Sequence, residues 1–252
     1  MSDVSKPLVV VISNVFNFLA EKVMEEIDGE VLVVHVGKTP DQIRAFRGAC
    51  ETMVIDRPAL HGAVLDHLMF GRLKKTPLAL FVDHDVIFAP GSFQKLRQVL
   101  VEEAERSPEA YIIAQRHEPH ARMLCNYRFR TVPMFMARPF MTRRCNSLGW
   151  FQDDRNDTGQ RIANAHPDLL ALVDEFVPYN DKNLRYDIFT AEDGWPFTHW
   201  TSGWMNQRPG SVAIWQPRVM KLMSSYDEID PSDVARMRAF DAFRDWLQAS
   251  HA

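Results

Sequence analysis

Cysteine is scarce in this sequence and is not arranged as a metal site. The three cysteines are Cys50, Cys125 and Cys145, and they are scattered without C-x-x-C spacing. A structural zinc site or a disulfide-stapled domain requires a recognisable spacing of paired cysteines. We therefore expect neither a zinc site nor a disulfide framework, as is typical of a reducing cytoplasm.

Long apolar runs are also missing. A helix that spans a bilayer needs roughly 18 to 20 consecutive apolar residues, and no stretch of the sequence reaches that length. Near the amino terminus, Asp3 and Lys6 precede a short apolar run that fits a strand better than a signal peptide. We predict no transmembrane segment and a cytoplasmic location.

Glycine-rich phosphate-binding loops are absent. A dinucleotide fingerprint requires a glycine-rich turn directly after the first strand, but residues 13–16 there read S-N-V-F. The P-loop pattern does not occur either. A nicotinamide cofactor is therefore disfavoured.

An overall positive charge is lacking as well. The chain has 33 acidic residues and 29 Lys and Arg residues, for a net charge of −4. Proteins that mainly bind nucleic-acid backbone carry a basic footprint. We therefore predict no nucleic-acid partner and expect any phosphate binding to be local.

One segment, residues 115–161, nevertheless concentrates arginine among aromatic residues and methionines. Its arginines are Arg116, Arg122, Arg128, Arg130, Arg138, Arg143, Arg144, Arg155 and Arg161. Arginine suits bidentate phosphate recognition, so part of this set is a candidate phosphate clamp. For any single arginine we favour a solvated face, and a nucleic-acid site made by the set is the outside alternative.

What is present indicates an α/β enzyme. The 252 residues, 46% hydrophobic and 25% charged, can bury a large core as one domain or two fused ones. The hydrophobic periodicity alternates between strands and helices, as in a parallel α/β sheet. We predict strands over 8–12, 31–36, 52–55, 78–82 and 111–114, and helices over 16–26, 42–50, 60–74, 92–106 and 160–164.

The most informative strand ends in two carboxylates. In the stretch Leu78 to Pro90, an apolar run over residues 78–82 ends at two carboxylates, Asp83 and Asp85. Alternate residues of a strand share a face, so both carboxylates can converge on one cation. Mg²⁺ and Mn²⁺ often take only one or two protein carboxylates and complete their shells with water and phosphate oxygens. The alternative is a plain strand-to-turn junction in which the carboxylates are solvated or cap the next helix.

The segment 78–96 resembles the nucleotide-sugar glycosyltransferases of the GT-A fold. It joins a hydrophobic strand, the D-x-D motif, a β-branched and aromatic pair, and P-G-S-F at the start of a helix. Over much of the remaining chain the resemblance is only architectural. It implies that Asp83 and Asp85 bind Mn²⁺ or Mg²⁺ together with the diphosphate of a sugar nucleotide.

The resemblance also implies a fold: a Rossmann-like GT-A sandwich with a central, mostly parallel sheet flanked by helices. Residues 1–115 are expected to form the nucleotide-sugar and metal-binding half, with Ser13 and Asn14 at the nucleotide. Residues 116–252 are expected to form the acceptor-side half and a carboxy-terminal helix. The two halves are expected to be fused into a single GT-A domain.

A second polar cluster contains Asp157, Thr158 and Gly159, ahead of the helix predicted from Gln160. It resembles a D-T-G element of some GT-A-like bacterial transferases, which implies that Asp157 faces the acceptor or shapes the sugar pocket. The alternative is ordinary helix capping, in which Asp157 or Thr158 accepts backbone amides and Gly159 eases the turn.

A third cluster, residues 191–204, is rich in tryptophan and titratable groups, as sugar pockets often are. Glu192 and Asp193 are similar to the E-D pair of many inverting GT-A enzymes, which implies that one of them is the base, and we favour Asp193. His199 resembles the carboxy-terminal histidine that completes the metal shell in many members, and imidazole suits Mn²⁺ better than Mg²⁺. The alternative is that His199 and the tryptophans are structural.

Together these features predict a metal-dependent glycosyltransferase, with a nucleotide-diphosphate sugar as donor and a carbohydrate or other hydroxyl as acceptor. For an inverting reaction, Asp193, Glu192 or Asp157 would deprotonate that hydroxyl. A sugar nucleotidyltransferase and a non-catalytic nucleotide- or sugar-binding module are the alternatives.

Overall fold

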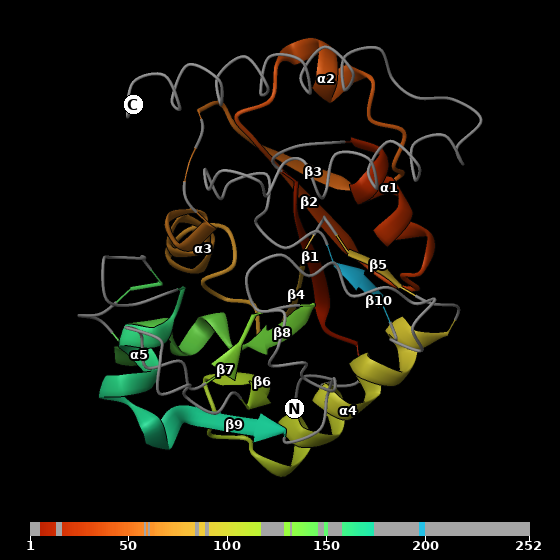
Figure 1. Cartoon of the computed structure of the whole chain (residues 1–252). Coiled ribbons are helices and arrows are strands. Elements are labelled where there is room, and N and C mark those ends of the chain that lie inside the picture. The colour runs from red at the N-terminus through yellow and green to blue at the C-terminus, as the bar shows by residue number, and fades with distance from the viewer. Residues whose placement is uncertain are drawn as a thin grey trace, which may run out of the picture.

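A computed structural model describes most of the amino-terminal two thirds of the chain. The described residues are 6–13, 17–57, 59, 61–83, 86–88, 91–116, 129–131, 133–145, 149–150, 158–173 and 197–199. Within them, a central sheet with helices on both faces forms the body of the protein (Figure 1).

The central sheet has eight strands in the described residues, in the order β3-β2-β1-β4-β8-β6-β7, with β9 also paired to β6. The strands are β1 (Leu8–Ser13), β2 (Val31–Val36), β3 (Glu51–Ile55), β4 (Ala79–Asp83), β6 (Ile112–Arg116), β7 (Phe129–Arg130), β8 (Met134–Ala137) and β9 (Leu170–Val173). The pairings show that β1, β2, β3, β4, β6 and β9 run in one direction and that β7 and β8 run in the other. The predicted Rossmann-like, mostly parallel α/β sheet is confirmed.

The strands β1 and β4 form because their apolar runs are buried on both faces of the sheet, as is typical of parallel strands. In β1, Val9 and Val11 face a first core, whereas Val10 and Ile12 face a second. In β4, Leu80 contributes to the first core, while its neighbours along the strand alternate in the same way. The sheet thus separates two apolar layers.

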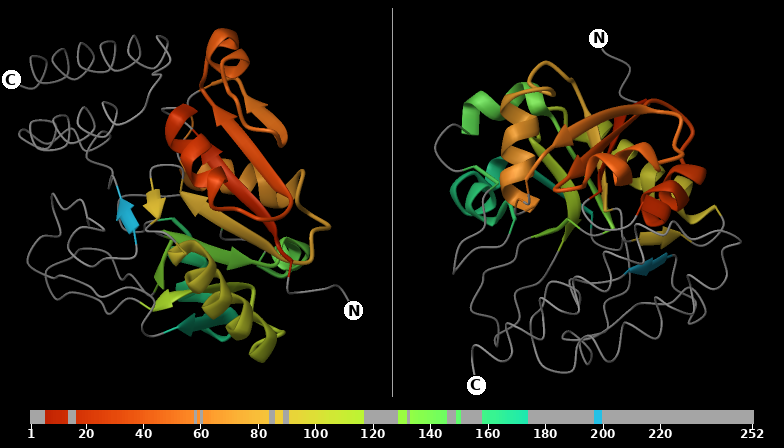
Figure 2. Two further views of the ribbon diagram at one scale, coloured as in Figure 1. Left: turned by 90° about the vertical axis from the view of Figure 1, so that its right-hand side faces the viewer. Right: turned by 90° about the horizontal axis from the view of Figure 1, so that it is seen from above.

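Helices cover both layers. They are α1 (Asn17–Glu25), α2 (Pro40–Arg44), α3 (His61–Phe70), α4 (Ser92–Arg106) and α5 (Gln160–Ala165), with two 3-10 helices, η1 (Pro139–Cys145) and η2 (Pro167–Leu169). Side chains of α1 and α4 pack in the first core, and side chains of α3, α5 and η1 pack in the second. Seen from above in Figure 2, these two groups of helices lie on opposite sides of the sheet.

A small antiparallel sheet stands apart from the central one. It joins β5 (Val86–Phe88), which follows the D-x-D motif, to β10 (Phe197–His199), and the two strands lie side by side in Figures 1 and 2. Phe197 pairs with Phe88 and His199 pairs with Val86. A segment far along the chain is thereby brought next to the end of the D-x-D motif.

The helix predicted over 42–50 is wrong in its extent, because α2 occupies only Pro40–Arg44. The helix ends at Arg44, and Phe46 packs edge-on against the ring of His35, with 4.9 Å between ring centroids. Gly48 then passes so close to Phe46 that a Cβ atom there would collide with the ring. Tertiary packing therefore overrides helical periodicity in this segment.

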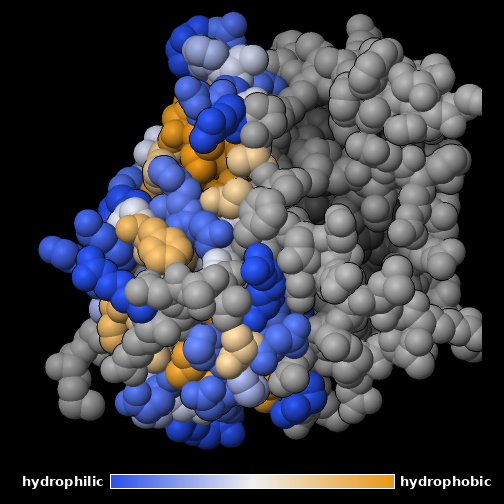
Figure 3. Space-filling model, turned by 90° about the vertical axis from the view of Figure 1, so that its left-hand side faces the viewer, coloured by the Kyte–Doolittle hydropathy of each residue, from blue (hydrophilic) through white to orange (hydrophobic). Residues whose placement is uncertain are grey.

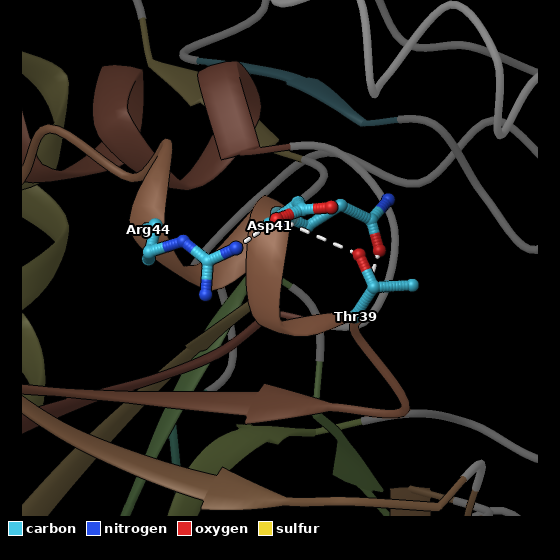
Figure 4. Close-up of polar contacts among 4 residues, drawn as sticks. Thr39, Asp41 and Arg44 are labelled. Atoms are coloured by element: carbon cyan, nitrogen blue, oxygen red, sulfur yellow. Dashed lines mark hydrogen bonds and ion pairs between the residues drawn. The ribbon is translucent and has the colours of Figure 1, made fainter.

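The start of α2 has a capping box, which the prediction also missed. The Thr39 hydroxyl accepts a hydrogen bond from the Gln42 amide at 3.3 Å, and the Gln42 side chain accepts one from the Thr39 amide at 2.9 Å. Pro40 occupies the first turn, where no amide hydrogen is needed. Figure 4 shows Thr39 at this end of the helix and the ion pair between Asp41 and Arg44 along it. These local bonds stabilise a helix of little more than one turn.

The predicted helix over 60–74 is shorter than expected. Its helical part, α3, ends at Phe70, and residues 71–75 continue as hydrogen-bonded turns. Leu73 is fully buried at that end, where its amide donates to the Leu68 carbonyl at 2.9 Å. The apolar pattern continues past the helix because the turn also packs against the core.

Three described strands of the sheet had no counterpart among the predictions. β8 inserts antiparallel between β4 and β6, β7 pairs with β6 antiparallel, and β9 pairs with β6 in parallel. All three strands come from beyond residue 116, so the sheet combines segments from the two predicted halves. The functional division at that residue stays a prediction.

The surface on the side of α3 and α5 is mostly hydrophilic, and its apolar residues form separate patches (Figure 3). Isolated exposed apolar side chains are normal on folded proteins. Among the described residues, none of the helices has both the length and the apolar character needed to cross a membrane.

Arg138 departs from the solvated face that we favoured for each arginine. It is buried directly after β8, and its two terminal nitrogens donate to the carbonyls of Ala110 and Ala104, each at 2.7 Å. Burial lowers the pKa of this guanidinium, and the nearby carboxylate of Glu109 raises it. Arg138 therefore ties the end of β8 to the last turn of α4, where backbone carbonyls need donors.

We expect Arg138→Met to lower the free energy of unfolding by about 3 kcal/mol, because two buried carbonyls lose a charged donor. Urea unfolding followed by tryptophan fluorescence measures this change. The matched control is Arg143→Met, which removes an exposed guanidinium and should change stability by under about 0.5 kcal/mol. Equal unfolding midpoints for the two variants would contradict the role of Arg138.

Candidate functional site

The strand order places a switch point between β1 and β4. From β1 the chain builds β2 and β3 on one side, and then crosses to β4 on the other. In open α/β sheets, ligands bind outside the carboxyl ends of the strands at such a point. Ile12 of β1 pairs with Asp83 of β4, and Ser13 follows Ile12 at the end of its strand. Two residues predicted to bind the donor, Ser13 and Asp83, thus lie at the ends of neighbouring parallel strands.

Ser13 belongs to a buried polar cluster at this edge. The Lys38 ammonium donates to the Ser13 hydroxyl at 2.7 Å and to the side-chain oxygen Oδ1 of Asn17 at 2.5 Å. The side-chain nitrogen Nδ2 of Asn17 in turn donates to the backbone carbonyl of Gln42 at 2.5 Å. All four side chains are less than 5% exposed. The cluster fixes the ends of β1 and β2 against the starts of α1 and α2.

Lys38 and Asn17 were not among the residues predicted from the sequence. The available signal was a lysine two residues past an apolar strand, after Gly37, whose φ of 63° is in the region that favours glycine. The Ser13 hydroxyl accepts a hydrogen bond from Lys38 inside the fold. A direct contact between this hydroxyl and a nucleotide stays a prediction.

His35, near the end of β2, is fully buried and was also overlooked. Neither ring nitrogen has a hydrogen-bond partner among the described residues. Burial, reinforced by the positive charge of Lys38, lowers the pKa of His35 to about 4. The imidazole is therefore neutral near pH 7 and behaves as a packed ring against Phe46.

Asp83 lies on the side of the sheet that α3 covers. Its Oδ1 is 4.0 Å from Nδ1 of His61, the first residue of α3. The Asp83 side chain is 14% exposed and that of His61 is 30% exposed. A partly buried carboxylate thus lies beside an imidazole at the carboxyl end of β4. His61 was not among the residues predicted from the sequence.

A buried polar network fixes α3 in place. The Trp150 amide donates to Asp66 Oδ1 at 2.7 Å, and the Trp150 indole donates to the Tyr111 hydroxyl at 3.0 Å. Tyr111 also bonds the Thr142 hydroxyl at 3.1 Å. At Gly149, where φ is 48°, a Cβ atom would lie only 2.9 Å from Asp66. The carboxylate of Asp66 is therefore an anchor for the helix.

The D-T-G element ends in a glycine with a packing role. Gly159 is the N-cap of α5 with φ 75°, and as a glycine it offers no side chain to cap the helix. A Cβ atom at Gly159 would lie 2.8 Å from the Phe129 ring and 2.9 Å from the Trp150 ring. Close backbone approach to two buried rings explains glycine here. The role predicted for Asp157 is not tested, because Asp157 lies outside the described residues.

Several other predicted residues also lie outside the described part of the chain. They are Asn14, Asp85, Glu192 and Asp193. For His199 the structure describes the backbone, which pairs with Val86 directly after the D-x-D motif. Of the arginine set, Arg116 and Arg143 are exposed as expected and Arg161 is half-buried.

The described donors suit a divalent cation only in part. Asp83 offers a hard oxygen at the edge of the sheet, with the imidazole of His61 near it. Among the described residues, no group of three or more His, Cys, Asp or Glu side chains is arranged to hold a metal ion. A cation with one or two protein carboxylates and further oxygen ligands from water and substrate fits this arrangement. Asp85 and His199 remain the predicted additional ligands.

No protein-family model matches the chain, and no curated protein matches its sequence. Among solved structures, the chain is similar to the galactosyltransferase LgtC in complex with donor and acceptor sugar analogs, at 11% identity and a TM-score of 0.49, over 91% of this chain and 99% of LgtC. It is similar to the glycosyltransferase GlyE of Streptococcus pneumoniae TIGR4, at 12% identity and a TM-score of 0.44, over 84% of this chain and 59% of GlyE. It is also similar to CMP:2-keto-3-deoxy-manno-octonic acid synthetase complexed with CTP, at 11% identity and a TM-score of 0.43, over 67% of this chain and 89% of that one.

We expect Gly159→Ala to lower the free energy of unfolding by about 2–5 kcal/mol. The left-handed backbone costs a residue with a Cβ atom about 1–2 kcal/mol, and overpacking a buried site adds about 1–3 kcal/mol. Gly91→Ala is the matched control, because Gly91 has φ 71° with no atom within 4 Å of its Cβ position. Urea unfolding should show a clearly larger loss at Gly159, and equal losses would rule out the packing role.

We expect His35→Leu to remove an acid sensitivity of folding. The pKa of His35 is about 4 in the folded protein and about 6.5 in an unfolded chain. The unfolded state therefore takes up a proton first, and stability is lost as the pH falls from about 6.5 to about 4. At pH 5 this loss amounts to about 2 kcal/mol.

The measurement is urea unfolding of both proteins at pH 7 and pH 5. The other titratable groups are shared, so the difference in pH dependence isolates His35. An unchanged pH dependence in His35→Leu would show that His35 titrates normally.

Proposed function

We propose that this protein is a metal-dependent glycosyltransferase that moves a sugar from a nucleotide-diphosphate donor to an acceptor hydroxyl. The observation that carries the proposal is the position of Asp83, a partly buried carboxylate at the carboxyl end of β4, beside the end of β1 at the switch point. A donor at this edge would meet the strand ends that carry Ser13 and Asp83.

Each part of the site has a role in this proposal. Asp83, with Asp85, would hold the divalent ion and orient the diphosphate. When bound, Mn²⁺ or Mg²⁺ would neutralise negative charge that develops on the departing diphosphate. The buried bonds of Lys38 fix Ser13 and Asn17, and the segment between these two residues would contact the nucleoside. The pairing of His199 with Val86 supports His199 as a third ligand by proximity of its backbone.

The transfer itself breaks the bond between the anomeric carbon and the diphosphate oxygen, and the electron pair leaves with the diphosphate. The acceptor oxygen forms the new bond to that carbon, and its proton must go to a base. In an inverting reaction Asp193, Glu192 or Asp157 would take this proton, with Asp193 the first choice. A retaining reaction needs no base at that place.

We expect one nucleoside diphosphate among UDP, GDP, CDP and ADP to bind more tightly with Mn²⁺ than without it, as measured by calorimetric titration. Asp83→Asn should weaken this binding roughly ten- to hundredfold, because an interaction with a charged group contributes about 1.5–3 kcal/mol. Asp168→Asn, which changes an exposed carboxylate far along the chain, is the matched control and should bind as the unmodified protein does.

The absence of binding to any of the four nucleotides, with or without Mn²⁺, would overturn the proposal. If one nucleotide does bind, slow hydrolysis of the corresponding sugar donor without an acceptor separates an enzyme from a binding module, because only an enzyme accelerates cleavage of the donor.

A further inference from the structure

His61 lies beside the proposed donor site, since its Nδ1 is 4.0 Å from Asp83 Oδ1. We infer that His61 is a positioning residue for Asp83, holding the carboxylate in the orientation that binding of the metal and diphosphate requires. The inference rests on the proposed function and adds a residue to its site.

Electrostatics favours this pairing. A carboxylate can only accept hydrogen bonds, so an imidazole nitrogen facing it is favourable when that nitrogen carries a proton. The distance of 4.0 Å is longer than that of a direct hydrogen bond, about 2.7–3.2 Å, so the attraction acts through space. One bridging water or a small shift of either side chain would complete a hydrogen-bonded contact. Because Asp83 is only 14% exposed, water screens this attraction less than it would at a free surface.

The imidazole is held by a helix that is fixed to the body of the protein. Val64, Leu65 and Leu68 of α3 are at most 1% exposed in the second core. The bond from the Trp150 backbone amide to Asp66 holds the same helix. The first residue of α3 is therefore supported by an anchored helix, as a positioning residue requires.

The backbone of Asp83 is fixed as well. Its amide donates to the Pro133 carbonyl at 3.1 Å, and the strand is paired with β1 and β8. With the backbone held, only the side-chain torsions remain to set the direction of the carboxylate. Partners that orient a metal-binding carboxylate typically matter about 10- to 100-fold in affinity or activity.

The test is a double-mutant cycle with His61→Leu and Asp83→Asn, measured as the Mn²⁺ concentration that gives half-maximal nucleotide binding. We expect His61→Leu to raise this concentration by about 10- to 100-fold. In the Asp83→Asn background the same change should have less than about a twofold effect, because the carboxylate that it orients is gone. A residue with a merely structural role would reduce binding equally in both backgrounds.

Conservative variants provide the rescue. Asn at position 61 places an amide near the position of Nδ1, whereas Gln places it near the position of Nε2. We expect His61→Asn to retain most of the binding and His61→Gln to retain less. His67→Leu is the matched control, because His67 is exposed in the last turn of the same helix, and it should bind normally.

The outcomes separate this inference from the proposed function. If the unmodified protein binds no nucleotide with Mn²⁺, both fail. If it binds and His61→Leu binds equally well, or if the losses simply multiply in the cycle, the inference fails and the proposed function stands. Thermal unfolding is measured on every variant, and if His61→Leu does not fold, equal losses in the Asn and Gln variants would overturn the inference.

Discussion

The parallel pairing of β1 with β4 is the constraint on which the rest of the structure depends. Both strands are buried on both faces, so their register determines which side chains enter each core. A slip of one residue would turn Asp83 away from α3 and toward the layer under α1 and α4. The hydrophobic effect thus fixes the side of the sheet on which the Asp83 side chain lies.

Polar side chains are also buried at this edge of the sheet. Their burial costs free energy that hydrogen bonds must offset. A buried ammonium such as that of Lys38 is tolerated because Ser13 and Asn17 accept from it. On the opposite face of the sheet, Asp66 accepts a hydrogen bond from the Trp150 backbone amide, and this bond helps to fix α3. The two faces therefore hold the ends of β1 and β4 from both sides, as a binding site built on strand ends requires.

The predicted elements with strong periodicity are present in the structure. The helix expected over 92–106 is α4, and the strand expected over 31–36 is β2, with the same bounds. The predictions failed where distant contacts override local pattern. The helix expected over 42–50 gives way to packing of Phe46 on His35, and β8 joins the sheet through partners on β4 and β6 that no local pattern identifies. The residue type alone does not predict that Arg138 donates hydrogen bonds to two buried carbonyls.

The sequence by itself determined that a buried strand ends in Asp83 and that the chain alternates between strands and helices, because the spacing of apolar residues is a local property. Only the tertiary structure decided that His61 lies beside Asp83, that Lys38 is buried against Ser13 and that β10 pairs with β5. These neighbours are distant in the chain. They meet because the order and register of the strands follow from burying two apolar faces at once, and that depends on the whole fold.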